Sequence, residues 1–164
     1  MPAIAPVSTY VGGPTLLIEW GGIRLLTDPT LDPAPATYTS PTTILEKVQG
    51  PALGRDALLP LDAVLLSHDH HFDNLDWLGR ELLAEAGRVI TTQAGAARLG
   101  ENAFGLAPWQ SHVLAYGGRT ASTEYLVASS EYYVLVTRYS VLATRYSSLV
   151  LNSPPVSTQS RCDG

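Results

Sequence analysis

Short strand-like apolar stretches, separated by turn residues, fill the first part of the chain. Paired glycines between two such stretches are a signal for a tight β-hairpin, and Gly21-Gly22 stands in such a place. Asp28-Pro29 ends the strand that follows, because proline restricts the conformation of the residue before it. The pattern therefore predicts three N-terminal strands, over residues 7–11, 15–20 and 23–27.

The middle of the chain predicts a strand followed by a helix. A Pro/Thr-rich stretch over residues 29–60 is expected to be a long loop, which in a compact domain is usually functional or mobile. Residues 62–67 form an apolar run typical of a buried strand. A leucine stripe at helical spacing comes next, and a strand (88–92) and a short helix (93–100) complete an α/β pattern. The predicted first helix has the stripe Leu75, Leu78, Leu82 and Leu83, an N-cap at Asp73 or Asn74, and its end at Gly87.

The last part of the chain has a different character. Residues 134–140, VLVTRYS, are followed at once by VLATRYS, and a degraded copy comes after them. Val, Thr and Tyr favour strand over a coiled coil of the same period. Two explanations stay open: a frameshift or a join to repetitive DNA, or a β-hairpin of the same domain. We divide the chain into the N-terminal part of a domain, over residues 1–115, and a divergent Tyr/Ser/Val-rich tail over residues 116–164.

Composition narrows the class of protein. With 164 residues, 45% hydrophobic and 15% charged, the chain is long enough for one globular domain. Its net charge of −5 gives no reason to expect nucleic acid or an anionic membrane as a partner. Cys162 is the single cysteine, so a disulfide framework and a cysteine metal site are excluded. We see no signal peptide and no apolar run of membrane-spanning length, and we expect a cytoplasmic protein.

The candidate chemistry lies in SHDHHFDNLD, residues 67–76, which carries three of the four histidines. Imidazole is the commonest protein ligand for zinc, and carboxylates complete such sites. We expect a metal site here, with His68, His70 and His71 as the candidate imidazole ligands and Asp73 as the carboxylate partner. Asp69 is a further ligand or supports the ligands from outside. The competing interpretation is a solvated polar loop.

Two pairings of the histidines stay open. If residues 68–70 are extended, the side chains of His68 and His70 point the same way, because side chains alternate along a strand. If the chain has already turned, His68 and His71 share a face, as residues three apart do on a helix.

This stretch resembles the first metal motif, HxHxDH, of the metallo-β-lactamase superfamily. It is most similar to a subgroup of zinc-dependent hydrolases with the motif SHDxHxDNLD followed by GR, here Gly79-Arg80. The segments 25–32 (LLTDPTLD), 50–53 (GPAL) and 105–109 (GLAPW) and the loop around Tyr38 also resemble that subgroup. The resemblance covers roughly residues 7–114. It implies an α/β fold with a metallo-β-lactamase-like β-sheet layer and flanking helices, whose C-terminal half is truncated or replaced by the repeat-like tail.

The resemblance implies a role for each matching position. His68 stands at the first histidine, and His71 stands at the second, with His70 as its competitor. Asp73 matches the motif's aspartate, which in the family lies on the second metal and helps to orient the attacking hydroxide. Asn74 replaces the last histidine, and Asp28 matches an aspartate near the site. The resemblance thus implies one or two zinc ions, with Asp73 as catalytic residue and with the supporting residues Asp28, Asp69 and Asn74.

The implied activity is zinc-dependent hydrolysis, in which a metal-activated hydroxide attacks an ester, amide, lactone or phosphodiester-type bond of a small molecule. The family's full site takes a further histidine, an aspartate and another histidine from the C-terminal half. The one remaining histidine here is His112, which we expect on an exposed or edge strand. The alternatives are an inactive truncated relative and a non-catalytic divalent-metal-binding module. Exposed strand edges would favour self-association.

Overall fold

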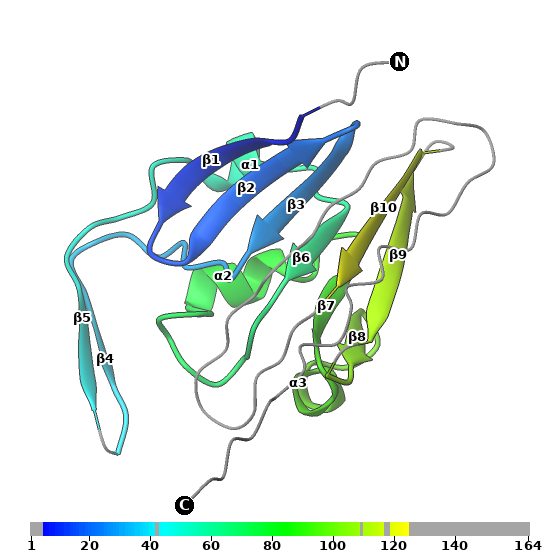
Figure 1. Cartoon of the computed structure of the whole chain (residues 1–164). Helices are drawn as coiled ribbons and strands as arrows, with labels where there is room; N and C mark the ends of the chain where they lie inside the picture. The colour runs from blue at the N-terminus through cyan, green and yellow to red at the C-terminus, as the bar shows by residue number, and fades with distance from the viewer. Residues whose placement is uncertain (1–4, 42, 109, 117–118, 125–164) are drawn as a thin grey trace, which may run out of the picture.

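The computed structural model describes residues 5–41, 43–108, 110–116 and 119–124. A six-stranded mixed sheet forms the centre of this part, in the order β1-β2-β3-β6-β7-β8 (Figure 1). The pairs β1/β2 and β2/β3 are antiparallel, and the pairs from β3 to β8 are parallel. The strands are β1 (Val7–Gly12), β2 (Thr15–Trp20), β3 (Ile23–Thr27), β6 (Ala63–Leu65), β7 (Val89–Thr92) and β8 (Ala103–Leu106).

Two separate hairpins and three short helices accompany the sheet. One hairpin projects away from the main sheet, as Figure 1 shows, and consists of β4 (Ala36–Thr39) and β5 (Ile44–Lys47). The other consists of β9 (Ser111–Tyr116) and β10 (Arg119–Glu124). The helices are α1 (Arg55–Leu58), α2 (Trp77–Leu82) and α3 (Gln93–Leu99). None of the helices in the described ranges is long and apolar enough to cross a membrane.

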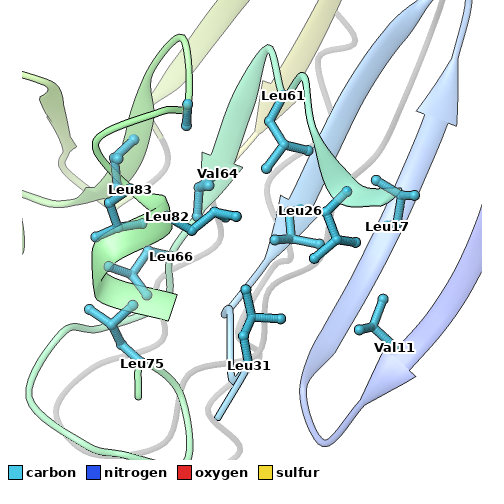
Figure 2. Packing of buried hydrophobic residues seen from close by; sticks show 13 residues of the cluster. Val11, Leu17, Leu26, Leu31, Leu61, Val64, Leu66, Leu75, Leu82 and Leu83 are labelled. Atoms are coloured by element: carbon cyan, nitrogen blue, oxygen red, sulfur yellow. The ribbon is translucent and has the colours of Figure 1, made fainter. Parts of the chain in front are cut away.

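Both faces of the sheet are buried, as expected for a sheet with parallel strands at its centre. On one face, side chains of β1, β2, β3 and β6 pack against α1, α2 and the segments around them (Figure 2). On the other face, Leu114 of β9 packs against a second apolar cluster. Adjacent residues such as Leu25 and Leu26 therefore pack on opposite faces of the sheet. The second cluster contains Ile18, Ile23, Leu25, Ala63, Leu65, Ile90 and Leu106.

The predicted N-terminal strands are confirmed. Gly21 and Gly22 connect β2 to β3 with φ values of 60° and 88°. Positive φ at both central residues is typical of the hairpin turn that matches the twist of the strands, and glycine adopts it without steric cost. The α/β class predicted from the strand and helix order is confirmed as well.

Three details of the middle of the chain were predicted wrongly. Residues 29–60 are not one irregular loop, because they contain β4, β5 and α1. The strand predicted over residues 62–67 is only Ala63–Leu65. The following helix is α2 with Asp76 as its N-cap, not Asp73 or Asn74, since the Asp76 side chain accepts a hydrogen bond from the amide of Gly79. The leucine spacing predicted a helix that continues to Gly87, whereas α2 ends at Leu82, and Leu78 of the leucine stripe is 41% exposed.

The repeat-like tail lies outside the described residues, as does everything after residue 124. The predicted division near residue 115 falls within the β9–β10 hairpin and stays a prediction.

Candidate metal centre

The histidine loop, residues 67–76, begins where β6 ends in the parallel part of the sheet. β6 lies between β3 and β7, and the loop leads directly into α2. Residues that follow the carboxyl end of a central parallel strand are a common position for ligand sites in open α/β sheets. The fold thus places the predicted motif at a favourable edge of the sheet.

The loop brings the three imidazole rings together. The ring centre of His68 lies 5.1 Å from that of His70 and 5.1 Å from that of His71. The centres of His70 and His71 are 4.4 Å apart. His70 and His71 are thus equally far from His68, and both pairings predicted from the sequence stay open.

The spacing of the rings fits a shared metal ion. Two imidazoles bound tetrahedrally through nitrogens at about 2.0–2.1 Å from one zinc ion have ring centres about 5 Å apart. However, among the residues that the structure describes, no three histidine, cysteine, aspartate or glutamate side chains converge as metal ligands. Three histidines in four consecutive positions keep the rings close together, and rotation about the side-chain bonds changes both the ring positions and the direction of the nitrogens. Such rotations could turn two or more of these nitrogens toward one metal ion, so the three histidines stay candidate ligands.

Neighbouring side chains orient His68. Its Nδ1 lies 2.9 Å from the hydroxyl of Ser67. That hydroxyl accepts a hydrogen bond of 3.1 Å from the side-chain amide of Asn74. Histidines that bind metal through one nitrogen usually hold the other in a hydrogen bond of this kind. Burial, with smaller effects from His70 and His71, lowers the pKa of His68 and favours the neutral imidazole that a metal requires.

Asp28 supports the start of the loop from β3. Its Oδ1 accepts a 2.6 Å hydrogen bond from the amide of Ser67, and its own amide donates to the carbonyl of Leu65 at 3.0 Å. Asp28 has a φ of 27°, in the left-handed region. The hydroxyl of Thr15 donates a 2.7 Å hydrogen bond to the carbonyl oxygen of Asp28. Burial raises the pKa of the Asp28 carboxyl to about 6. Asp28 thus lies next to the loop, as the resemblance implied.

Asp69 is engaged by two arginines. Its carboxylate forms a two-point ion pair with the guanidinium of Arg98, with Nε 2.8 Å from Oδ2. Its carbonyl accepts a 2.6 Å hydrogen bond from Arg80. The hydrogen bond with Arg98 lowers the pKa of the Asp69 carboxyl. This pairing favours a supporting role for Asp69 over a role as ligand. Asp69 still lies next to the histidines, with its Oδ1 3.9 Å from Nδ1 of His70.

The remaining predicted residues lie at the surface of the loop. His70, His71 and Asp73 are exposed. The neighbours of the His70 ring still remove part of it from water, and this effect, together with the smaller effect of the charge of His71, lowers the pKa of His70. Asp73 is at the rim of a cavity that also touches Phe72. His112 lies elsewhere, on β9, where its ring is 4.4 Å from that of Phe104.

Sequence reasoning missed two residues of this site. Ser67 was included in the motif and at the end of a strand but was given no role, yet its hydroxyl contacts His68. Arg98 was placed in a short helix without a role, and it reaches Asp69 across 29 positions. Arg80 was noted only as part of the GR dipeptide. The hydroxyl of Ser67, directly before His68, was the one local signal of a contact in this site. No residue near Arg98 in the sequence indicates that Asp69 is its partner.

Comparison with known proteins supports the fold. No protein-family model matches the chain. The isothiocyanate hydrolase from Delia radicum gut bacteria matches 74% of this chain with 21% identity and a TM-score of 0.52. A possible metal-dependent hydrolase from Veillonella parvula matches 77% with 16% identity and a TM-score of 0.49. CmlA, a diiron beta-hydroxylase from Streptomyces venezuelae, matches 77% with 22% identity and a TM-score of 0.41.

The matches cover only part of each known protein. The chain spans about half the length of the first two, 49% and 50%, and 25% of CmlA. The likeness to the isothiocyanate hydrolase shows that the two chains share a fold over the matched region.

Proposed function

We propose that the chain is a zinc-dependent hydrolase of the metallo-β-lactamase superfamily, in which residues 1–115 form the N-terminal part of the domain. The observation that carries the proposal is the spacing of the three imidazole rings, 4.4–5.1 Å, in the loop that follows a central parallel strand. The isothiocyanate hydrolase, which shares the fold over the matched region, agrees with it. A small molecule is the proposed substrate.

The residues divide into ligands and supports. His68 with His70 or His71 would hold the metal ion, and Asp73 would be the carboxylate at the same site and the catalytic residue. A bound zinc ion supplies hydroxide at neutral pH and polarises the bond to be cleaved. The lowered pKa values of His68 and His70 keep these rings neutral and available.

Supporting residues act on the ligands from a second layer. Ser67 and Asn74 hold the Nδ1 side of His68, while Asp28 fixes the Ser67 amide. Asp69 ties the loop to α3 through Arg98. Such partners fix the orientation of the imidazole rings, and their loss commonly lowers metal affinity by roughly 10–100-fold.

Hydrolysis by the zinc-loaded protein tests this function. We expect the wild type to cleave at least one of an ester, an amide, a lactone and a phosphodiester, and a chelator to abolish the activity. Asp73→Asn keeps the size of the side chain and should lose most of the turnover while it retains zinc. Activity that survives both the chelator and Asp73→Asn would contradict the proposal.

A non-catalytic module is the second candidate. The chain spans about half of the similar hydrolases, and His112 packs on Phe104, so the described residues provide one cluster of ligands. Zinc binding without turnover would favour a metal-binding module, and the absence of both would favour an inactive truncated relative. Self-association remains a further proposal, with β1 and β8 at the edges of the described main sheet.

A further inference from the structure

A cavity of about 180 Å³ lies beside the histidine loop. Its walls come from the β1–β2 turn, the β4–β5 hairpin and the loop itself, and they are mainly apolar. Asp73, the proposed catalytic residue, is on the rim. The walls include Gly12, Gly13, Tyr38, Leu45, Phe72 and Asp73.

One wall is a fixed aromatic surface. The rings of Tyr38 and Phe72 are stacked, with centres 4.7 Å apart and planes at 12°. The Tyr38 hydroxyl donates a 2.7 Å hydrogen bond to Asp32, and Asp32 in turn accepts from the amide of Leu78 in α2. This network ties the hairpin wall to the histidine loop and its helix. A flat aromatic wall favours a flat apolar ligand over a branched polar one.

The charges around the cavity disfavour an anion. Lys47 is the one cation among the described lining residues, and its ammonium is already paired with Asp76 at 2.9 Å and bonded to the carbonyl of Thr30 at 3.0 Å. Glu46 and Asp73 add two exposed carboxylates. In the zinc-free chain, a negatively charged group would meet these carboxylates without an unpaired cation among the described lining residues to balance them.

The size of the cavity matches one ring. An apolar protein cavity of about 150 Å³ is known to bind benzene. Resting on the proposed function, we propose that this cavity binds a neutral apolar group of about phenyl size on the substrate. The substrate class is then an ester, amide or lactone that carries such a group.

Amide NMR spectra of the full chain, recorded with and without zinc, test this assignment with two probes of similar size, benzyl alcohol and benzoate. The amides of Gly12, Gly13 and Gly50, which all line the cavity, are the reporters. We expect benzyl alcohol to shift these signals in a saturable way. In the zinc-free chain, benzoate should bind at least fivefold more weakly than benzyl alcohol because of its charge.

A matched pair of variants locates the probe. In β5, Leu45 is half-buried and lines the cavity, whereas Ile44 next to it is 66% exposed. Leu45→Trp should weaken benzyl alcohol binding at least fivefold by filling the cavity, and Ile44→Trp should change it less than twofold. If Leu45→Trp loses the dispersed spectrum of a folded protein, Leu45→Phe takes its place with the same expectation.

Several results would overturn the assignment. These are no shift at the three glycines, equal binding of benzoate to the zinc-free chain, or equal losses in the Leu45 and Ile44 variants. Zinc measured in the same samples separates this inference from the proposed function. Zinc without benzyl alcohol binding overturns the cavity assignment alone. Binding without zinc contradicts the proposed function and supports the ligand preference of the cavity.

Discussion

The carboxylate of Asp69 and the guanidinium of Arg98 form a two-point ion pair that joins the histidine loop to α3. Arg80 of α2 holds the carbonyl of the same aspartate at 2.6 Å. Asp69 itself is buried, with an exposed fraction of 4%. The loop that carries the histidines is therefore clamped between two helices, and its shape depends on residues outside the motif.

Removal of Arg98 tests this clamp. Arg98→Ala leaves a buried carboxylate without its partner, which should lower the free energy of unfolding by about 1–2 kcal/mol after allowance for the exposed guanidinium. Arg55→Ala is the matched control, because Arg55 pairs with Glu85 at the surface, and its loss should cost less than about 0.5 kcal/mol. Urea denaturation of both variants gives the comparison, and equal losses would contradict the clamp.

Gly79 occupies a position that no larger residue fits. A Cβ added there would lie 1.9 Å from the carbonyl oxygen of Pro29. Gly79→Ala should therefore push α2 away from the loop after β3 and cost about 3 kcal/mol or more. At Gly54, by contrast, an added Cβ meets nothing within 4 Å, so Gly54→Ala should cost less than about 1 kcal/mol. Thermal denaturation that ranks the two variants the other way would refute this packing.

The buried Asp28 carboxyl predicts a specific pH dependence. Its pKa is about 6 in the folded chain, above the ordinary value of 3.8, and burial is the main cause. Between these values the folded state binds more protons than the unfolded state, so the Asp28 contribution to stability falls as pH rises from about 4 to about 6. It amounts to at most about 3 kcal/mol.

Asp28→Asn isolates this contribution, because the amide oxygen can still accept from Ser67. The stability of the wild type relative to the variant should increase as the pH of chelator-treated protein falls from 6 to 4, over the window set by the two pKa values. Comparison with the variant is needed because His68 and His70 have lowered pKa values and act in the opposite direction. Parallel curves for the two proteins would show that Asp28 does not titrate in this range.

Zinc binding should persist in mildly acidic solution. Protons compete with the metal for imidazole, and the pKa values of His68 and His70 lie below the ordinary 6.5. Equilibrium dialysis at a series of pH values, with free zinc at least about tenfold above the dissociation constant measured at pH 8, should therefore place half-loss of zinc below pH 6.5. Half-loss above that value would mean that these rings are not the ligands.

The sequence was sufficient for the parts of the fold that local chemistry determines. Gly21-Gly22 specified a hairpin, and the apolar run before the histidines specified a buried strand. The start of α2 was misjudged because Asp73, Asn74 and Asp76 are all acceptable N-caps. Asp76 is the N-cap because its side chain also accepts a hydrogen bond from the backbone amide of Asp32, 44 positions away. Such long-range bonds leave no local pattern.

The site shows the same division. Three histidines within four positions predicted a cluster, and the structure places their rings together. The alternative between His70 and His71 depends on side-chain torsions, which spacing in sequence does not set. Arg98 and the Tyr38–Phe72 stack arise from the packing of α3 and the β4–β5 hairpin against the loop. These contacts join segments that are far apart in the chain.

The most direct test of the metal site is the zinc content of the purified chain by elemental analysis. His68→Ala/His71→Ala is compared with wild type, and His112→Ala is the control because its ring packs on Phe104. The account predicts one or two zinc ions per chain in the wild type and in His112→Ala, and loss of zinc in the double variant. Zinc well below one per chain, unchanged in the double variant, would contradict a metal site in the histidine loop.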